Sequence, residues 1–159
     1  MVDHYDRIAR TLHWLVAALV LVQFSTGWSW GWFERGSDPR FYLFRIHLYC
    51  GYAVLVPALA RILWRLAHGA PPLPSGMGRP MRIAAHATHG LLYLLILLQP
   101  ILGAVTVTAF GKSLGWTGRA HVALAYVIAA IVALHVAAAL WHHFVLRDRL
   151  ILRMLPTRR

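Results

Sequence analysis

The chain has 159 residues, of which 59% are hydrophobic and only 13% are charged, and its formal net charge is +11. Because a soluble domain averages about 25% charged residues, this composition, with a mean hydropathy of +0.58, excludes an ordinary water-soluble domain. The length suits one domain over residues 1–159. Cys50 is the single cysteine, which excludes an internal disulfide, and the sequence has no C-x-x-C-H motif for covalent haem attachment.

Four apolar segments are predicted to cross a membrane. A spanning helix needs roughly 20 mainly apolar residues, and the sequence offers such stretches at about 10–32, 41–66, 81–110 and 120–146. The first ends in "GWSWGWF", an aromatic cluster typical of the membrane–water interface. The second and third are separated by the Pro- and Gly-rich "HGAPPLPSGMGRP". The predicted fold is an all-α, integral membrane four-helix bundle, and no internal repeat is evident.

The basic residues predict how this bundle is oriented. So basic a chain would suit nucleic acid, but its cations flank apolar spans, so we expect no nucleic-acid partner and assign part of the charge to lipid contact. With the N-terminus inside, the cytoplasmic side holds 11 of the 16 Lys and Arg residues, as the positive-inside rule requires. Both termini are therefore predicted to be cytoplasmic.

Four of the ten histidines lie at two matching depths. His47 and His121 are near the outer ends of the second and fourth spans. His13 and His135 are toward the inner ends of the first and fourth spans. An ionisable side chain inside a membrane helix is costly and indicates a functional site by default, so the sequence predicts an outer pair and an inner pair of functional histidines.

The spacing of His121 and His135 places both on one face of the fourth span. Fourteen residues at about 100° each come within roughly 40° of four full turns and rise about 21 Å. Neutral imidazole is a good ligand of haem iron. One helix can thus supply an axial ligand to each of two stacked cofactors, and pairs of neutral imidazoles occur in b-type haem centres.

Neighbouring residues suit this hypothesis. A small residue, which leaves room for a porphyrin, stands four positions after each predicted ligand: Ala17, Gly51, Ala125 and Ala139. Arg61, fourteen residues after His47, is predicted to pair with a propionate near the inner haem. His86 and His89 in the third span also lie on the inner side. They remain rivals of His13 for the inner iron; otherwise they ligate nothing or line a polar site near the cytoplasmic surface.

Two more histidines end the fourth span in "WHHF". His142 follows His135 by seven residues, about 20° short of two turns, so it continues the same stripe roughly 10 Å further inward. A titratable group there suits proton exchange with a quinone headgroup, and the alternative is a simple interfacial histidine. No role is assigned to His143.

Stretches along the whole chain resemble bacterial cytochrome b561: "RTLHWLVAALV", "RIHLYCGYAVL", "AAHATHGLLYLLILLQPILG", "HVALAYVIAAIVALHVAAALWHHF" and the tail "LRMLP". The resemblance implies a four-helix cytochrome of the bacterial inner membrane with two b haems. It assigns one haem to His13 and His135 and the other to His47 and His121.

The resemblance also implies a redox function. In the bacterial b561 branch, superoxide is oxidised at the outer, periplasmic face and ubiquinone is the electron acceptor, so we expect an oxidoreductase that passes electrons from the outer haem to the inner haem and on to the quinone pool. The family also resembles the b-type membrane subunits of hydrogenases and respiratory formate dehydrogenases. The alternative function is therefore a membrane anchor that receives electrons from a partner oxidoreductase subunit.

The outer connection "GKSLGWTGRAH" is shorter than this branch leads us to expect. Lys112 and Arg119 remain in it, and with Arg35, Arg40 and Arg45 they are predicted to steer a small anion such as superoxide toward the outer haem. A histidine-lined proton or metal transporter without haem is disfavoured, because the apolar cores of the spans contain no Asp or Glu.

Overall fold

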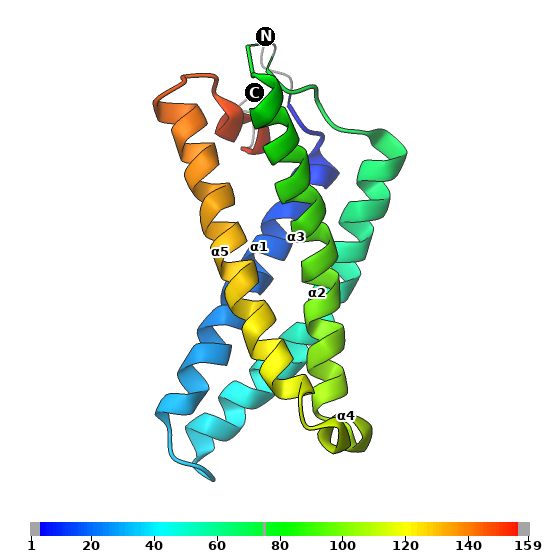
Figure 1. Ribbon diagram of the computed structural model, residues 1–159, viewed down its shortest axis with the longest axis vertical. Helices are drawn as coiled ribbons and strands as arrows, with labels where there is room; N and C mark the ends of the chain where they lie inside the picture. Colours follow the sequence, from blue (N-terminus) through cyan, green and yellow to red (C-terminus); the bar gives the residue numbers. More distant parts are fainter. Residues whose placement is uncertain (1–3, 75, 156–159) are drawn as a thin grey trace.

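The computed structural model describes residues 4–74 and 76–155. Four long helices run along the longest axis of the molecule (Figure 1): α1 (Arg7–Ser29), α2 (Asp38–His68), α3 (Arg79–Thr106) and α5 (Thr117–Phe144). Shorter helices complete the described chain, which contains no strand: η1 (Trp30–Trp32), α4 (Ala109–Leu114) and η2 (Leu150–Met154). All four long helices are long and apolar enough to cross a membrane. The predicted all-α membrane bundle is confirmed.

The boundaries differ from the predicted ones mainly at the third span. The helix α3 ends at Thr106 rather than near residue 110, and the separate helix α4 follows it. Thr108 begins α4, because its hydroxyl accepts a hydrogen bond from the Gly111 N–H at 3.0 Å and so caps the new helix. Gly115, in the left-handed region at φ 72°, ends it. The outer connection is therefore a compact helical turn.

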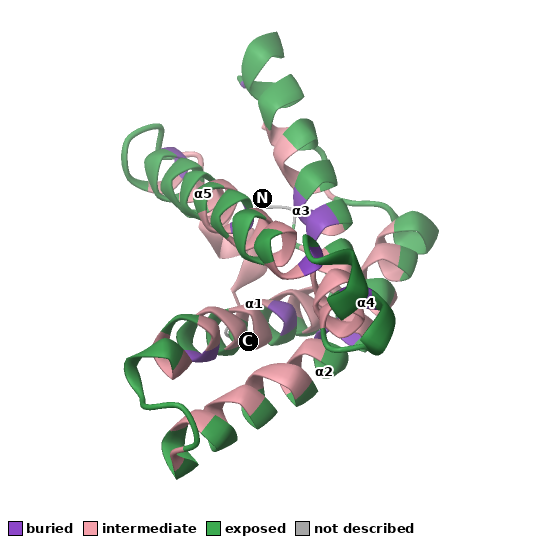
Figure 2. Ribbon diagram, turned by 60° about the horizontal axis from the view of Figure 1, so that its bottom comes forward, coloured by how far each residue is buried: buried purple, intermediate pink, exposed green. Residues whose placement is uncertain are grey.

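The long helices form two pairs. The helix α1 packs along α2, α3 packs along α5, and contacts between α2 and α3 join the pairs. A small core of Val16, Val54 and Ala58 lies where they meet, with Ile96 and Leu97 of α3 packed against it. Figure 2 shows that buried positions are few and that much of each helix is exposed. These exposed apolar surfaces suit contact with lipid, because lipid tails are as apolar as the side chains.

The first and last described segments meet at one end of the bundle, where the Tyr5 N–H donates to the Arg153 carbonyl. The short helix η2 lies across this end. The Arg10 guanidinium donates to the Leu155 carbonyl at 2.6 Å, and the Trp14 indole donates to the Met154 carbonyl at 2.9 Å. We call this the terminal end, and the opposite one the loop end.

Candidate functional site

The predicted outer pair meets near the loop end. His47 comes from α2 and His121 from α5, and their ring centroids are 6.1 Å apart with the ring planes at 88°. Two metal–nitrogen bonds of about 2 Å each, together with the inner halves of two imidazole rings, add up to roughly 6 Å. The spacing would fit one iron ion held between the rings of His47 and His121.

The ring of His47 is held in a defined tautomer. Its Nδ1 lies 3.1 Å from the Gln23 carbonyl oxygen and 3.1 Å from the Thr26 hydroxyl oxygen. Because a carbonyl only accepts, Nδ1 carries the proton and donates it. The other ring nitrogen, Nε2, then keeps the lone pair that a metal requires, which is the usual arrangement of a ligating histidine.

The ring of His121 is tightly confined but less well bonded. A Cβ atom added to Gly103 of α3 would lie 2.8 Å from His121 Cε1, so only glycine admits the ring in this position. Its Nδ1 is buried and has no hydrogen-bond partner within the described part of the chain, and neither has Oε1 of the neighbouring Gln99. Buried polar atoms without a hydrogen-bond partner are rare in folded proteins.

The two pairs of helices repeat one arrangement. The Gln23 side chain of α1 donates to the His47 backbone carbonyl at 2.8 Å, and the Gln99 side chain of α3 donates to the His121 carbonyl at 2.9 Å. Four residues after each glutamine stands the glycine against which the histidine ring packs, and a Cβ on Gly27 would lie 3.0 Å from His47 Cε1. Sequence reasoning missed this repeat.

The signal for the repeat is present in the sequence. The pattern His-x9-Gln-x3-Gly occurs in the first span from His13 and in the third span from His89. It is easily overlooked because the intervening residues do not match. By this correspondence His89 occupies in the second pair of helices the position that His13 occupies in the first.

The inner level accordingly gathers three histidines. The rings of His13 and His135 have centroids 6.4 Å apart at 67°, and those of His89 and His135 are 5.2 Å apart at 75°. The first separation is near the roughly 6 Å of a metal between two imidazoles, and the second is shorter. Arg61 interacts electrostatically with both His13 and His135, and its guanidinium also donates to the Ala9 carbonyl at 2.9 Å.

A cavity of about 140 Å³ lies beside the outer pair and is lined from all four long helices. His47 and His121 line it together with Gly51 and Ala125, two of the small residues that the sequence singled out. Gly27 lines it too, although the His47 ring fills the space over that glycine. The two imidazoles, the unprotonated Nε2 of His47 and the apolar lining suit a haem between the helices.

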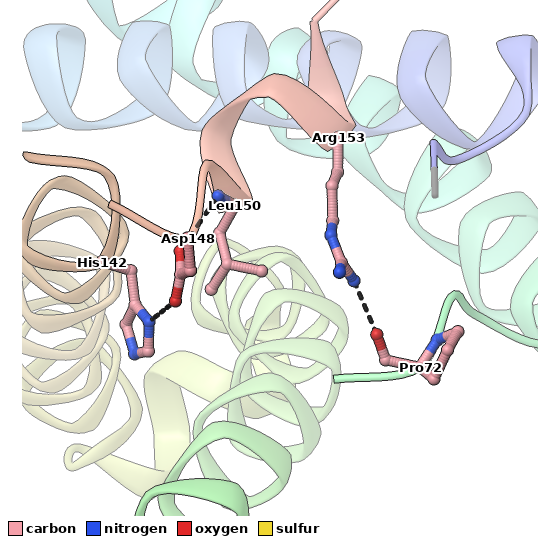
Figure 3. Close-up of polar contacts among 5 residues, drawn as sticks. All are labelled: Pro72, His142, Asp148, Leu150 and Arg153. Carbon is pink, nitrogen blue, oxygen red and sulfur yellow. Dashed lines mark hydrogen bonds and ion pairs between the residues drawn. The ribbon is translucent and has the colours of Figure 1, made fainter. Parts of the chain in front are cut away.

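At the terminal end, His142 is 7% exposed and its Nδ1 pairs with the Asp148 carboxylate (Figure 3). The other carboxylate oxygen of Asp148 accepts from the Leu150 N–H at 3.2 Å. Asp148 was not singled out from the sequence, because it lies in the basic tail beyond the spans. His86 is exposed, and His143 has a buried Nδ1 without a partner among the described residues.

Among the described residues, some cations of the loop end are exposed and others contact neighbouring groups of the protein. Lys112 of α4 and Arg119 in the first turn of α5 are exposed. The Arg40 guanidinium donates to the Phe33 carbonyl at 2.9 Å, and the Arg45 guanidinium lies over aromatic rings of its own helix. Of the five predicted steering residues, Lys112 and Arg119 are thus among the exposed charges of this surface.

Comparisons with known proteins cover nearly the full chain. The family model described as prokaryotic cytochrome b561 matches residues 4–157. A cytochrome b562 of Cereibacter sphaeroides is 38% identical over 97% of this chain and 96% of the relative. A probable superoxide oxidase, CybB, of Yersinia pestis is 35% identical over 98% and 97%, and cytochrome b561 homolog 2 of Escherichia coli is 31% identical over 96% and 92%. The chain is therefore an electron-transferring bacterial membrane protein that belongs to the prokaryotic cytochrome b561 family, for which b-type haem is the implied cofactor.

Proposed function

We propose that this chain holds two b haems, an outer one between His47 and His121 and an inner one between His13 and His135. The observation that carries the proposal is the pair of ring separations, 6.1 Å and 6.4 Å, at two levels of one bundle. When bound, the haems supply the one-electron redox chemistry that protein side chains lack.

The protein's own contribution is to position and insulate this chemistry. Gln23 and Gln99 fix the ligand-bearing turns of α2 and α5 against α1 and α3. Arg61 supplies a cation at the inner level, where a propionate carboxylate can pair with it. The surrounding apolar side chains exclude water and lower the local dielectric constant, which is one of the factors that set a haem potential.

We propose further that the net reaction is the oxidation of superoxide by ubiquinone. Two superoxide ions each lose one electron and become O₂, while one ubiquinone takes up two electrons and two protons and becomes ubiquinol. The name of the Yersinia pestis relative, a probable superoxide oxidase, supports this assignment. The excess of Lys and Arg near the terminal end supports an orientation with that end in the cytoplasm and the loop end in the periplasm.

Lys112 and Arg119 serve this reaction as steering charges. Both side chains are exposed at the loop end, on the connection that leads into the helix carrying His121. A cationic rim raises the local concentration of a small anion and speeds its encounter with the site. Added salt screens these charges and so weakens the effect.

His142 serves the reaction at the other end as the proton-handling residue for quinone. Its pairing with Asp148 orients the imidazole, so that the other ring nitrogen can exchange a proton with a quinone. The described tail holds this pair in place, because the Leu150 N–H donates to Asp148.

The proposal is tested by assaying purified protein for superoxide-dependent reduction of a water-soluble ubiquinone. We expect ubiquinol to form at one per two superoxide ions consumed, and the rate to fall with added salt and in the double variant Lys112→Glu/Arg119→Glu. The matched control is Arg79→Glu, an exposed charge at the start of α3 on the terminal end, which should leave the rate unchanged. Haem-loaded protein that reduces quinone only after a partner dehydrogenase is added would favour the membrane-anchor function instead.

A further inference from the structure

We propose that Thr26 is a positioning residue that sets the reduction potential of the outer haem through His47. The inference rests on the proposed ligation of that haem by His47 and His121. It concerns a hydroxyl group that touches neither the iron nor a substrate.

The hydroxyl of Thr26 has a defined direction. It donates to the Val22 carbonyl one turn earlier at 2.7 Å, and its oxygen lies 3.1 Å from His47 Nδ1. Because its own proton is used in the bond to Val22, the oxygen presents a lone pair to the imidazole and accepts from Nδ1–H. Thr26 is 7% exposed, so water does not compete for this bond.

The imidazole proton is thus shared between two acceptors, the Thr26 hydroxyl and the Gln23 carbonyl, each at 3.1 Å. A hydrogen bond donated by the far nitrogen of a ligating imidazole raises the basicity of the nitrogen on the metal. A more basic ligand stabilises the ferric state more than the ferrous one, so this pair of acceptors lowers the potential of the haem.

The opposite ligand lacks this support. The residue before the contacting glycine is Thr26 in α1 but Leu102 in α3, and Leu102 offers no hydroxyl. His121 Nδ1 is correspondingly buried without a hydrogen-bond partner in the described chain. The Gln99 backbone interacts with the His121 ring, as the Gln23 carbonyl does with His47, so the two sites differ in the hydroxyl that Thr26 adds beside His47.

The test compares Thr26→Val, which keeps the shape and removes the hydroxyl, with Thr26→Ser, which restores the hydroxyl. The control is Thr106→Val. The Thr106 hydroxyl also donates to a carbonyl one turn earlier, that of Leu102 at 2.9 Å, but forms no hydrogen bond with a histidine of the described chain. Haem content and a potentiometric titration followed by haem absorption are measured for each protein. The outer haem is the component lost in His47→Ala.

Thr26→Val is expected to keep both haems, because the Gln23 carbonyl still orients His47. It should raise the equilibrium constant for reduction of the outer haem several-fold, and a tenfold change corresponds to about 59 mV for one electron. Thr26→Ser should return it toward wild type, and Thr106→Val should leave it unchanged. An unchanged outer potential in a fully loaded Thr26→Val protein overturns the proposal.

Loss of the outer haem from Thr26→Val would also test the proposal, through the behaviour of Thr26→Ser. Its recovery in Thr26→Ser supports a role for the hydroxyl, whereas loss in both variants assigns the effect to packing and overturns the proposal. A wild-type protein without haem, or a His47→Ala protein that keeps both haems, would instead refute the ligation on which the inference rests, so the two failures are distinguishable.

Discussion

Gln99 donates from its side-chain amide to the backbone carbonyl of His121 at 2.9 Å. This bond ties α3 to the turn of α5 that carries a proposed iron ligand, and it fixes the height of that turn along the bundle. The glycine one turn later in α3, Gly103, then allows the histidine ring to approach the helix backbone. Together the two residues determine where the ring of His121 can lie.

Gly103→Ala should therefore displace the His121 ring. The added Cβ would lie 2.8 Å from Cε1, closer than two carbon atoms approach without a shift, and overpacking of this kind costs about 1–3 kcal/mol. We expect the outer haem to be lost or loosely bound while the inner haem remains. Haem content and the reduced-minus-oxidised spectrum of the purified protein measure the effect.

The control for that variant is Gly90→Ala in the same helix, where an added Cβ meets no atom within 4 Å. It should leave the haem content unchanged. Equal haem content in Gly103→Ala, Gly90→Ala and wild type would show that the close approach of His121 to α3 has no bearing on cofactor binding.

Alanine substitutions should show which of the three inner histidines binds the inner haem. The His13–His135 separation of 6.4 Å suits an iron between the rings better than the 5.2 Å of His89–His135. We expect His13→Ala to lose the inner haem and His89→Ala to retain it, as read from haem content. The reverse result would assign the inner iron to His89, the corresponding residue of the repeated framework.

His142→Ala should slow quinone reduction without removing haem. Loss of a positioned proton donor costs on the order of a hundredfold or more in the step it serves. Asp148→Asn should act in the same direction but more weakly, because it keeps the shape and removes the charge that pairs with His142. The measurement is the rate of ubiquinol formation; a rate equal to wild type in His142→Ala would place proton delivery elsewhere.

Asp6 should make a small contribution to stability that depends on pH. Its slight burial acts to raise the pKa, but hydrogen bonds from the Ala9 N–H and the Trp64 indole outweigh this and hold the pKa of Asp6 below its usual value of 3.8. A lowered folded-state pKa means that the charged form stabilises the fold above about pH 4 and that this contribution disappears as the pH falls further. Asp6→Ala should cost about 1 kcal/mol as a lost helix cap.

The control is Asp6→Asn, which keeps an oxygen to accept from the Ala9 N–H but cannot titrate. Thermal unfolding in detergent should show a stability difference between wild type and Asp6→Asn at pH 7 that shrinks as the pH falls below about 4. A difference that is the same at both pH values would rule out the Asp6 carboxylate as its source.

The sequence was sufficient to predict the four spans, because hydropathy is a local property. Helical spacing led to the proposal of the two histidine pairs. The fourteen-residue spacing indicated that His121 and His135 share one helix face. Their depths in the membrane then matched His121 with His47 and His135 with His13. The ring centroids of the two proposed pairs lie 6.1 Å and 6.4 Å apart.

The supporting residues were harder to predict, because their roles depend on contacts between helices. Thr26 and Gln23 are unremarkable in an apolar helix until α2 brings His47 against them. Gly103 resembles any other helix glycine until the His121 ring fills the space above it. The helix α4 was missed because its start depends on one hydroxyl cap at Thr108.

The most direct test of the proposed cytochrome is the number of b haems per purified chain in wild type, His47→Ala and His135→Ala. We predict two haems in wild type and one in each variant, with a different component of the redox titration lost from each. One haem in wild type, or two in either variant, would contradict the assignment of the two histidine pairs.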